Sequence, residues 1–525
     1  MAFRALVVTL FLIGLAVRVA PLLEGGDVAI PEGRLLSQWP TEDGYFMLAM
    51  GRNVALGHGL SVSGGEMPTN GTQPLTTFVW ALGFSLVGGD RLLGVLLAQV
   101  LQILAALGTA WLMVKLAERA LGEREGARET GLLAAGFWFA SPVAIPHTMN
   151  CLETGFYALL AVGVAVAFLA RPRAELWSWR RTLGFGVLLG ACFWVRNDGA
   201  FLIAAACLTY LAPALDDRAS FRPRLARVLA FGATSVLVAS PWLIFNVVEF
   251  GHLMPVSGRA EALTGEFGGN LVGIPIVLAE YLMTVLPIPH ALSGAWWMIA
   301  MATLVVVLAV GVLIARREHW TPREKQLLLL VGLYVLALVA FYGLYFGAAW
   351  FLPRYFLPAS PFLALFFAVG VRWAHGFVQE RGALGHLVPV AAAAAVAVMG
   401  FLHLRQYRNG ADHMHFQVVR WVNENVPAET WVGAIQTGTL GFFHDRTINL
   451  DGKVNIAAYE ALLADRQAVY VADETPIVYL ADWVGMRDWL TMPLIAERFE
   501  LIVEDEDANL GVLRRRGPPP RSGLR

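Results

Sequence analysis

The chain has few charged residues for its length. Only 15% of its 525 residues are Asp, Glu, Lys or Arg, whereas soluble domains carry roughly 25%. Hydrophobic residues make up 57% of the chain, and the mean hydropathy is +0.59. The composition excludes an ordinary soluble domain and predicts a polytopic α-helical membrane protein.

Cysteine is scarce too, and no basic stripe occurs. Cys151, Cys192 and Cys207 lie in or beside apolar segments and no cysteine follows them, which excludes a disulfide framework and a zinc motif. The net charge of -1 and the missing basic stripe argue against a nucleic-acid partner. Without an internal repeat, the sequence gives no support to a transporter built from inverted repeats.

The apolar runs are separated by loops whose charge indicates their side of the membrane. A membrane span needs about 20 apolar residues, and cytoplasmic loops are rich in Lys and Arg. Five short loops are basic: 118–130, 171–181, 215–227, 315–326 and 372–386. With all five in the cytoplasm, the parity of the crossings predicts about eleven transmembrane helices, a cytoplasmic N-terminus and an outer C-terminus.

The first apolar run predicts an uncleaved span, because Arg18 interrupts it and no clear cleavage site follows. The eleven predicted spans lie at about 5–22, 91–117, 131–147, 155–170, 182–195, 199–213, 226–247, 293–315, 327–346, 355–373 and 386–404. They form a transmembrane domain over residues 1–404.

Two apolar runs are too short to cross the membrane. We expect 73–86 and 271–288 to be surface segments on the outer side, so that 23–90 becomes a long first outer loop. The short runs 182–195 and 199–213 meet at "RNDG", which predicts a polar apex lining a cavity.

The pattern changes beyond Arg405. "HFQVVRWVNEN" and "NIAAYEALLA" predict helices, whereas "TWVGAI", "AVYVA" and "FELIVE" predict strands. Residues 405–514 therefore form a small extracytoplasmic α/β domain, and 515–525 are predicted to be a disordered tail.

Two adjacent carboxylates, Glu42 and Asp43, open a predicted helix in the first outer loop. Acids at this position cap helix N–H groups and complement the dipole. A carboxylate held at a membrane surface can also act as a general base or a metal ligand. The sequence leaves both interpretations open, and they are compatible.

Other polar residues share the predicted outer side. Arg52, Arg196, Arg259 and Arg354 either bind an anionic ligand or pair locally with carboxylates and lipid headgroups. Glu153 completes an acidic cluster or supports the helix that follows it.

Six segments together resemble the GT-C superfamily of membrane glycosyltransferases. "TEDGYFMLAMGRNVALGHGL" is similar to its first-outer-loop signature, most closely in the arabinofuranosyltransferase-like and protein mannosyltransferase-like branches. In order along the chain follow "CLETGFYALL", "VRNDGAFL", "FGHLMPVSGRAE", "PRYFLPASPFLALFF" and "VVRWVNENVPAETWVGAI". The chain departs from the pattern at Glu42, where relatives usually have Asp, and at Arg259, where they often have Lys.

The resemblance implies an enzyme of the cell envelope, in the plasma or inner membrane, with its active site on the outer side. A sugar passes from a polyprenyl-phosphate donor to a glycan, lipid or protein hydroxyl with inversion, and Asp43 or Glu42 is the base. By the same resemblance, Arg354, Arg196, Arg259 and Arg52 bind the donor phosphate. It further implies substrate contacts by Tyr45, His58, Tyr355 and Asp198, and a divalent cation (Mg, Mn or Ca) held by Glu153 and Asp43.

Two alternatives belong to other functional classes. A transporter or flippase for lipid-linked sugars needs a cavity and arginines but no acid pair. A non-catalytic scaffold would bind glycan or a partner protein through residues 405–514. The acid pair, the length of the first loop and the outer arginines favour the enzyme.

Overall fold

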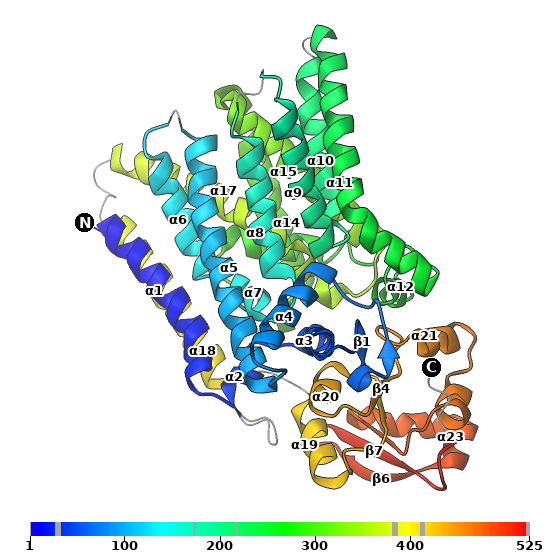
Figure 1. The fold of residues 1–525 in the computed structure, drawn as a ribbon. Coiled ribbons are helices and arrows are strands. Elements are labelled where there is room, and N and C mark those ends of the chain that lie inside the picture. The colour runs from blue at the N-terminus through cyan, green and yellow to red at the C-terminus, as the bar shows by residue number, and fades with distance from the viewer. Residues whose placement is uncertain are drawn as a thin grey trace.

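A computed structural model describes residues 2–26, 33–122, 124–171, 175–215, 218–288, 290–380, 387–409 and 415–520. A helical bundle occupies one part of the molecule, and a small domain built around a sheet packs against one end of it (Figure 1). The predicted fold class, a helical membrane protein with a C-terminal α/β domain, is confirmed.

Within the described ranges, seven helical segments are long and apolar enough to cross a membrane. They contain α1 (Ala2–Leu23), α5 (Arg91–Ala120), α11 (Phe221–Phe250), α14 (Trp296–Ala315), α15 (Pro322–Leu344), α17 (Ser360–Glu380) and α18 (Leu387–Asn409). Four shorter helices pack among them: α6 (Ala127–Phe139), α8 (Thr154–Phe168), α9 (Trp179–Val195) and α10 (Gly199–Leu211). A helix therefore lies at each of the eleven predicted spans, but the number that cross remains a prediction.

One predicted span is two helices. The run 131–147 breaks after α6, and α7 (Ala144–Met149) begins a new segment. Pro142 explains the break, because a proline disfavours helical backbone in the residue before it. The loop from α7 to α8 then carries Glu153, directly before α8.

The basic loops share one end of the bundle. The connections α5–α6, α8–α9 and α10–α11 lie away from the C-terminal domain (Figure 1). This is the arrangement that the charge pattern predicts, with basic loops on one side of the membrane. Arg173 and Arg381, in two of the predicted basic loops, fall outside the described residues.

The first outer loop is largely helical. It contains α2 (Arg34–Ser37), α3 (Glu42–Ala55), the short strands β1 (Ser61–Val62) and β2 (Met67–Pro68), and α4 (Pro74–Leu86). Trp80 of α4 is buried against α3, where Gly51 leaves room for it: a Cβ at Gly51 would lie 2.7 Å from the Trp80 Cβ. The opposite face of α4 exposes Leu82 and Leu86, as expected of a helix at a membrane surface.

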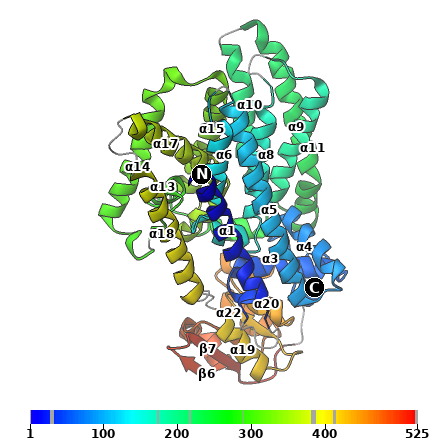
Figure 2. The ribbon, with the colours of Figure 1, turned by 90° about the vertical axis from the view of Figure 1, so that its left-hand side faces the viewer.

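The other short run forms α13 (Ile274–Met283), which follows α12 (Val256–Ala262). It packs between α14 and α17 and buries Tyr281, so it belongs to the bundle instead of lying apart on its surface (Figure 2). The helix α16 (Leu352–Phe356) leads into α17 and places Arg354 at the end nearest the C-terminal domain.

The C-terminal domain is a mixed sheet with helices. Its strands are β3 (Val432–Ala434), β4 (Thr447–Asn449), β5 (Tyr479–Asp482), β6 (Phe499–Asp505) and β7 (Leu510–Arg515), in the order β4-β3-β5-β7-β6. The first three pair in parallel and the last two antiparallel, with Val432 opposite both Thr447 and Tyr479. Its helices include α19 (Phe416–Asn425), α20 (Gly438–Phe443), α21 (Ile456–Leu463) and α23 (Pro493–Arg498).

Two local predictions in this domain are wrong. "AVYVA" is helical, as α22 (Gln467–Val469) followed by a π-helical turn over Tyr470–Glu474, since a short apolar run fits a buried helix as well as a strand. Arg515 is not in a tail: it ends β7 and donates to the carbonyls of Val471 and Ala472 at 2.9 and 2.7 Å, which caps that helical turn. Residues 521–525 of the predicted tail lie outside the described residues.

Candidate active site

The start of α3 lies where the bundle, the first outer loop and the C-terminal domain meet (Figure 1). Thr41 caps the helix, because its Oγ1 accepts from the Gly44 N–H at 3.2 Å. Gly44 packs so closely on the Asn150 carbonyl that a Cβ there would lie 2.0 Å from that oxygen. With the cap supplied by Thr41, both carboxylates that follow are free to bind other parts of the molecule.

Glu42 binds the C-terminal domain. Its carboxylate accepts from the backbone N–H groups of Gly438 and Thr439, the latter at 2.9 Å, and from the Thr439 hydroxyl at 2.5 Å. Burial raises the pKa of Glu42 to about 7, because the cost of desolvating the carboxylate exceeds the benefit of these hydrogen bonds. Glu42 therefore caps α20 and attaches the C-terminal domain to the first outer loop.

Asp43 faces the bundle. Its Oδ2 lies 2.5 Å from Nη1 of Arg354 on α16. The Nε of Arg354 is buried without a hydrogen-bond partner among the described residues, so the guanidinium keeps a donor for a further acceptor. The sequence left the roles of the two carboxylates open, and the structure gives them different partners. Glu42 binds the C-terminal domain, and Asp43 forms an ion pair with Arg354.

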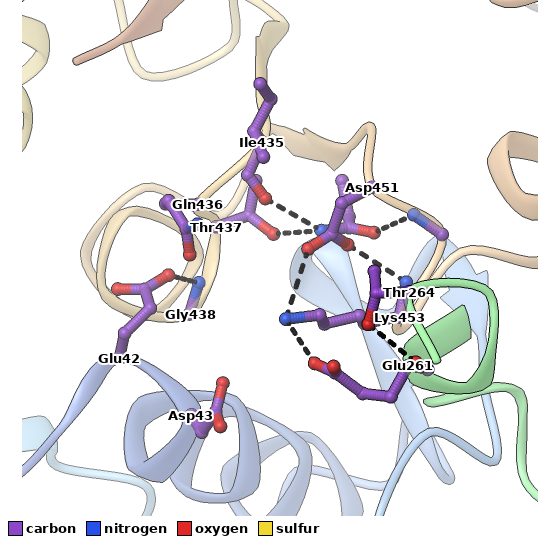
Figure 3. A network of polar contacts seen from close by, with 12 residues as sticks. Glu42, Asp43, Glu261, Thr264, Ile435, Gln436, Thr437, Gly438, Asp451 and Lys453 are labelled. Atoms are coloured by element: carbon purple, nitrogen blue, oxygen red, sulfur yellow. Dashed lines mark hydrogen bonds and ion pairs between the residues drawn. The ribbon is translucent and has the colours of Figure 1, made fainter. Parts of the chain in front are cut away.

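A lysine from the C-terminal domain borders the same space. Lys453 lies after β4, and its Nζ is 2.6 Å from Glu261 Oε1 of α12 and 3.8 Å from Asp451 Oδ2. Figure 3 shows the Asp43 carboxylate pointing toward the space beside Lys453 and Glu261, while Glu42 reaches Gly438. Three segments far apart in the chain therefore supply charged groups to one site.

The charges at this site determine which groups are ionised. Burial raises the pKa of Asp43, but the positive charges of Arg354 and Lys453 outweigh it and hold the pKa below its ordinary value. Burial lowers the pKa of Lys453, but Asp43, Asp451 and Glu261 outweigh it and hold the pKa above its ordinary value. Near neutral pH the site contains an ionised carboxylate between two cations.

The "RNDG" segment forms a buried network behind Arg354. Arg196 Nη2 contacts Asp198 Oδ2 at 2.6 Å and the Tyr342 hydroxyl at 2.9 Å, and its Nε lies 3.8 Å from Glu153. Arg196 Nη1 also donates to the backbone carbonyl of Arg354 at 3.2 Å. The apex is polar as predicted, and its side chains fix the backbone that carries Arg354. That it lines a cavity remains a prediction.

Two predicted substrate-binding tyrosines lie in the core. Tyr45 is fully buried, its hydroxyl donates to the Leu36 carbonyl at 2.6 Å, and its ring packs on Phe442. Tyr355 stacks on Tyr342 with ring centroids 4.2 Å apart. Both tyrosines are therefore part of the packing around the site.

Three more of the predicted residues lie elsewhere. Arg52 and His58 line a separate cleft of about 970 Å³. Arg52 is nine residues, about 13 Å, along α3 from Asp43, and His58 lies beyond the end of that helix. Arg52 contacts Asp445 at 3.5 Å and the Gly89 carbonyl at 2.9 Å. Arg259 packs its guanidinium on the Tyr459 ring, 4.6 Å from the centroid. The structure does not bring them to the Asp43 carboxylate.

Sequence reasoning missed Lys453, Glu261 and Asp451. The segment "LDGKVN" carried a signal, because an Asp-Gly turn directly after a strand commonly lies at a sheet edge. Nothing in one sequence, however, shows that this edge faces the first outer loop.

The attachment made by Glu42 predicts a local effect. In Glu42→Ala, two N–H groups of α20 lose their acceptor, which costs about 1–3 kcal/mol, and their hydrogen exchange accelerates roughly 5- to 150-fold. Hydrogen–deuterium exchange of peptides covering Gly438–Phe443 measures this. Glu42→Gln keeps an acceptor oxygen and is expected to stay closer to wild type. Unchanged exchange in Glu42→Ala would show that α20 does not depend on this contact.

Comparison with known proteins gives one family match and several shared folds. Residues 403–510 match a family described as a domain of unknown function, DUF8728. No curated protein matches the chain by sequence.

Solved structures resemble the whole chain. ArnT from Cupriavidus metallidurans, in a crystal structure bound to undecaprenyl phosphate, matches with a TM-score of 0.60 and 14% identity over 97% of both chains. AglB from Archaeoglobus fulgidus, in complex with an inhibitory peptide and a dolichol-phosphate, matches with a TM-score of 0.53 and 12% identity over 94% of this chain and 71% of that one. The Archaeoglobus fulgidus oligosaccharyltransferase in complex with Zn and sulfate gives 0.53 and 13% over the same shares. The chain has the fold of the GT-C glycosyltransferases, and the resemblance predicted from the sequence is confirmed at that level.

The predicted divalent cation does not fit the arrangement of this chain's own residues. Asp43 forms an ion pair with Arg354, and Glu153 forms one with Arg196. Across the described ranges, no three His, Cys, Asp or Glu side chains group closely enough to hold a metal. Each proposed ligand would have to release its arginine partner before it could bind a metal.

Proposed function

We propose, on the premise of the GT-C fold, that this protein transfers a sugar from a polyprenyl-phosphate donor to an acceptor hydroxyl on the outer side of the membrane. The observation that supports this proposal most strongly is the Asp43–Arg354 pair beside Lys453 at the start of α3. It combines an ionised carboxylate, which can accept a proton, with cations that can stabilise a departing phosphate.

In the proposed reaction, residues of this site account for the proton that is removed and for the charge that develops on the leaving phosphate. Asp43 takes the proton of the acceptor hydroxyl as its oxygen bonds to the anomeric carbon. The bond from that carbon to the phosphate oxygen breaks on the opposite face, which inverts the configuration. Its electron pair leaves with the polyprenyl phosphate, whose charge Arg354 and Lys453 stabilise.

The same geometry supports a second role for Arg354. In the structure its guanidinium neutralises Asp43. A donor phosphate would compete for this guanidinium, because arginine binds phosphate bidentately. As Arg354 turns toward the phosphate, Asp43 loses a stabilising charge and becomes a stronger base when the substrate is in place.

The charge pattern supports an orientation. With the basic loops in the cytoplasm, the C-terminal domain and Asp43 lie on the outer side of a cell membrane. The arabinofuranosyltransferase-like signature supports arabinofuranose as the sugar. A role in synthesis of the cell wall is proposed on the same basis.

The experiment is a transfer assay with purified protein in proteoliposomes. Radiolabelled polyprenyl-phosphate arabinofuranose, mannose and glucose are supplied with membrane acceptors. The expected result is transfer of labelled sugar to the acceptor, with one polyprenyl phosphate released for each sugar transferred. Label that changes leaflet but stays on the lipid would indicate a flippase, and binding without turnover would indicate a scaffold.

Lys453 provides a prediction about the C-terminal domain. Lys453→Gln is expected to lower kcat/KM for the donor by about 10- to 100-fold, because one cation facing the phosphate is lost from a partly buried site. Lys453→Arg keeps the charge and is expected to recover part of the rate. Steady-state kinetics measure both, with Lys325→Gln at the other end of the bundle as a charge-matched control. Equal rates for Lys453→Gln and wild type would remove Lys453 from the site.

A further inference from the structure

Three arginines gather at the end of the bundle opposite the C-terminal domain. Arg124, Arg316 and Arg372 line a cavity of about 220 Å³, together with Trp320 and Trp373. Tryptophan at the end of membrane-spanning helices commonly marks the level of the lipid headgroups. The cavity therefore lies where a headgroup of the cytoplasmic leaflet would be.

The three arginines are held in place and outnumber the two glutamates that line the same cavity. Arg124 pairs with the buried Glu324 at 2.6 and 2.8 Å. Arg372 donates to the Gly126 carbonyl at 2.6 Å, and a Cβ at Gly126 would lie 2.1 Å from the guanidinium, so the backbone fits closely around it. The nearest acid to Arg372 is Glu129, at 4.0 Å and half exposed.

Of the three arginines, Arg316 has the least negative charge near it. Its guanidinium carbon lies 4.3 Å from the centroid of the Trp373 ring, and no carboxylate in the described part of the chain pairs with it. The cavity thus presents cationic groups fixed on aromatic and backbone surfaces.

An apolar groove opens from the same residues. It has a volume of about 370 Å³, lies between α13, α14, α15 and α17, and shares Leu121, Trp320, Glu324 and Val369 with the cavity. Its other lining side chains are apolar. Along α15 it extends from Glu324 to Val339, about 22 Å at 1.5 Å per residue, which exceeds one leaflet of a roughly 30 Å hydrocarbon core.

We infer that this cavity and groove bind an anionic phospholipid of the cytoplasmic leaflet. Its phosphate would lie among the three arginines and an acyl chain would fill the groove. Cationic pockets between membrane helices on the cytoplasmic side are suited to anionic headgroups, and guanidinium binds phosphate bidentately.

This site is separate from the one proposed for the donor. Arg354 and Arg372 belong to one apolar helical segment, and their separation of eighteen residues corresponds to about 27 Å, close to the thickness of the hydrocarbon core. A phosphate at Arg354 cannot also contact Arg372. The lipid at the second site is a bound component, not the substrate.

Native mass spectrometry of the full-length protein tests the inference. The protein in detergent is titrated with dioleoyl-phosphatidylglycerol or dioleoyl-phosphatidylcholine. We expect one phosphatidylglycerol retained per chain and little phosphatidylcholine. In Arg316→Gln/Arg372→Gln we expect about 10- to 30-fold weaker retention, since each basic residue near an anionic headgroup contributes about 1 kcal/mol.

Two further variants keep the test independent of folding defects and of net charge. Arg317→Gln/Lys325→Gln removes two charges at the same end but outside the cavity, and is expected to retain the lipid. Gly332→Phe fills the groove without changing charge, since Gly332 lines it and a Cβ there meets nothing within 4 Å. It is expected to lose the lipid.

Several outcomes would overturn the inference. These are equal retention of both lipids, equal loss in the Arg317→Gln/Lys325→Gln control, or full retention in Gly332→Phe. One-for-one displacement of phosphatidylglycerol by polyprenyl phosphate would assign the groove to the donor tail instead.

Discussion

Asp43→Asn lowers kcat for sugar transfer by about 10²–10⁴-fold, the cost of removing a general base. Asparagine has nearly the same shape as aspartate and keeps an oxygen facing Arg354, so the site is expected to remain assembled. Only the capacity to accept the proton of the acceptor hydroxyl is lost. Single-turnover transfer from a radiolabelled polyprenyl-phosphate sugar measures the rate, and equilibrium binding of the donor shows that the site is intact.

The neighbouring acid provides the matched control for this experiment. Glu42→Gln makes the same carboxylate-to-amide change one residue away, where the side chain caps α20. We expect a loss smaller than that of Asp43→Asn, with no change in the pH at which the base titrates. A larger loss in Glu42→Gln than in Asp43→Asn would exchange the two roles. Full activity in both would favour a transporter.

Arg354→Gln is expected to lower kcat/KM by about 10²–10³-fold, the range for loss of one donor to a developing negative charge. The same change has a distinct effect on pH dependence. Burial alone raises the pKa of Asp43, and Arg354 is the strongest of the charges that lower it. Without Arg354 that pKa is expected to rise.

The direction of the pH effect follows from the role of the base. Asp43 acts as a base only when ionised, so activity falls as pH drops through its pKa. In wild type this decline lies below the ordinary range of an aspartate, because the nearby cations lower the pKa of Asp43, and in Arg354→Gln it moves to higher pH. The pH profile of kcat/KM measures the shift, and Arg354→Lys is expected to restore it in part. A lower rate with an unmoved profile would mean that Arg354 has a structural role alone.

The sequence predicts most of the helices because long apolar runs have few alternatives. Apolar runs of sufficient length and basic loops place α1, α5, α11, α14, α15 and α18, and Pro142 marks the one break that the run length conceals. The strand predicted for "AVYVA" was wrong because five apolar residues fit either a strand or a buried helical turn.

The site was less predictable, since its contacts join distant segments. Asp43 and Arg354 are 311 residues apart in the sequence, and the resemblance to known signatures pointed to both. Lys453 belongs to no such signature, and Glu261 ends one of the quoted segments but was not singled out as a site residue. The two meet only when the C-terminal domain packs on α12. Tyr45 shows the opposite error: it lies within the signature, but its ring is needed in the core.

The contact between Glu42 and α20 also has a consequence for synthesis of the protein. Its two ends are 396 residues apart, so the first outer loop leaves the ribosome long before its partner is made. A nascent chain that has inserted its helices still lacks the C-terminal domain and, with it, the Lys453 ammonium. Under the proposed function, a chain that still lacks this last segment would have an incomplete site. Completion of the chain would then set the moment at which sugar transfer can begin, without any separate inhibitor.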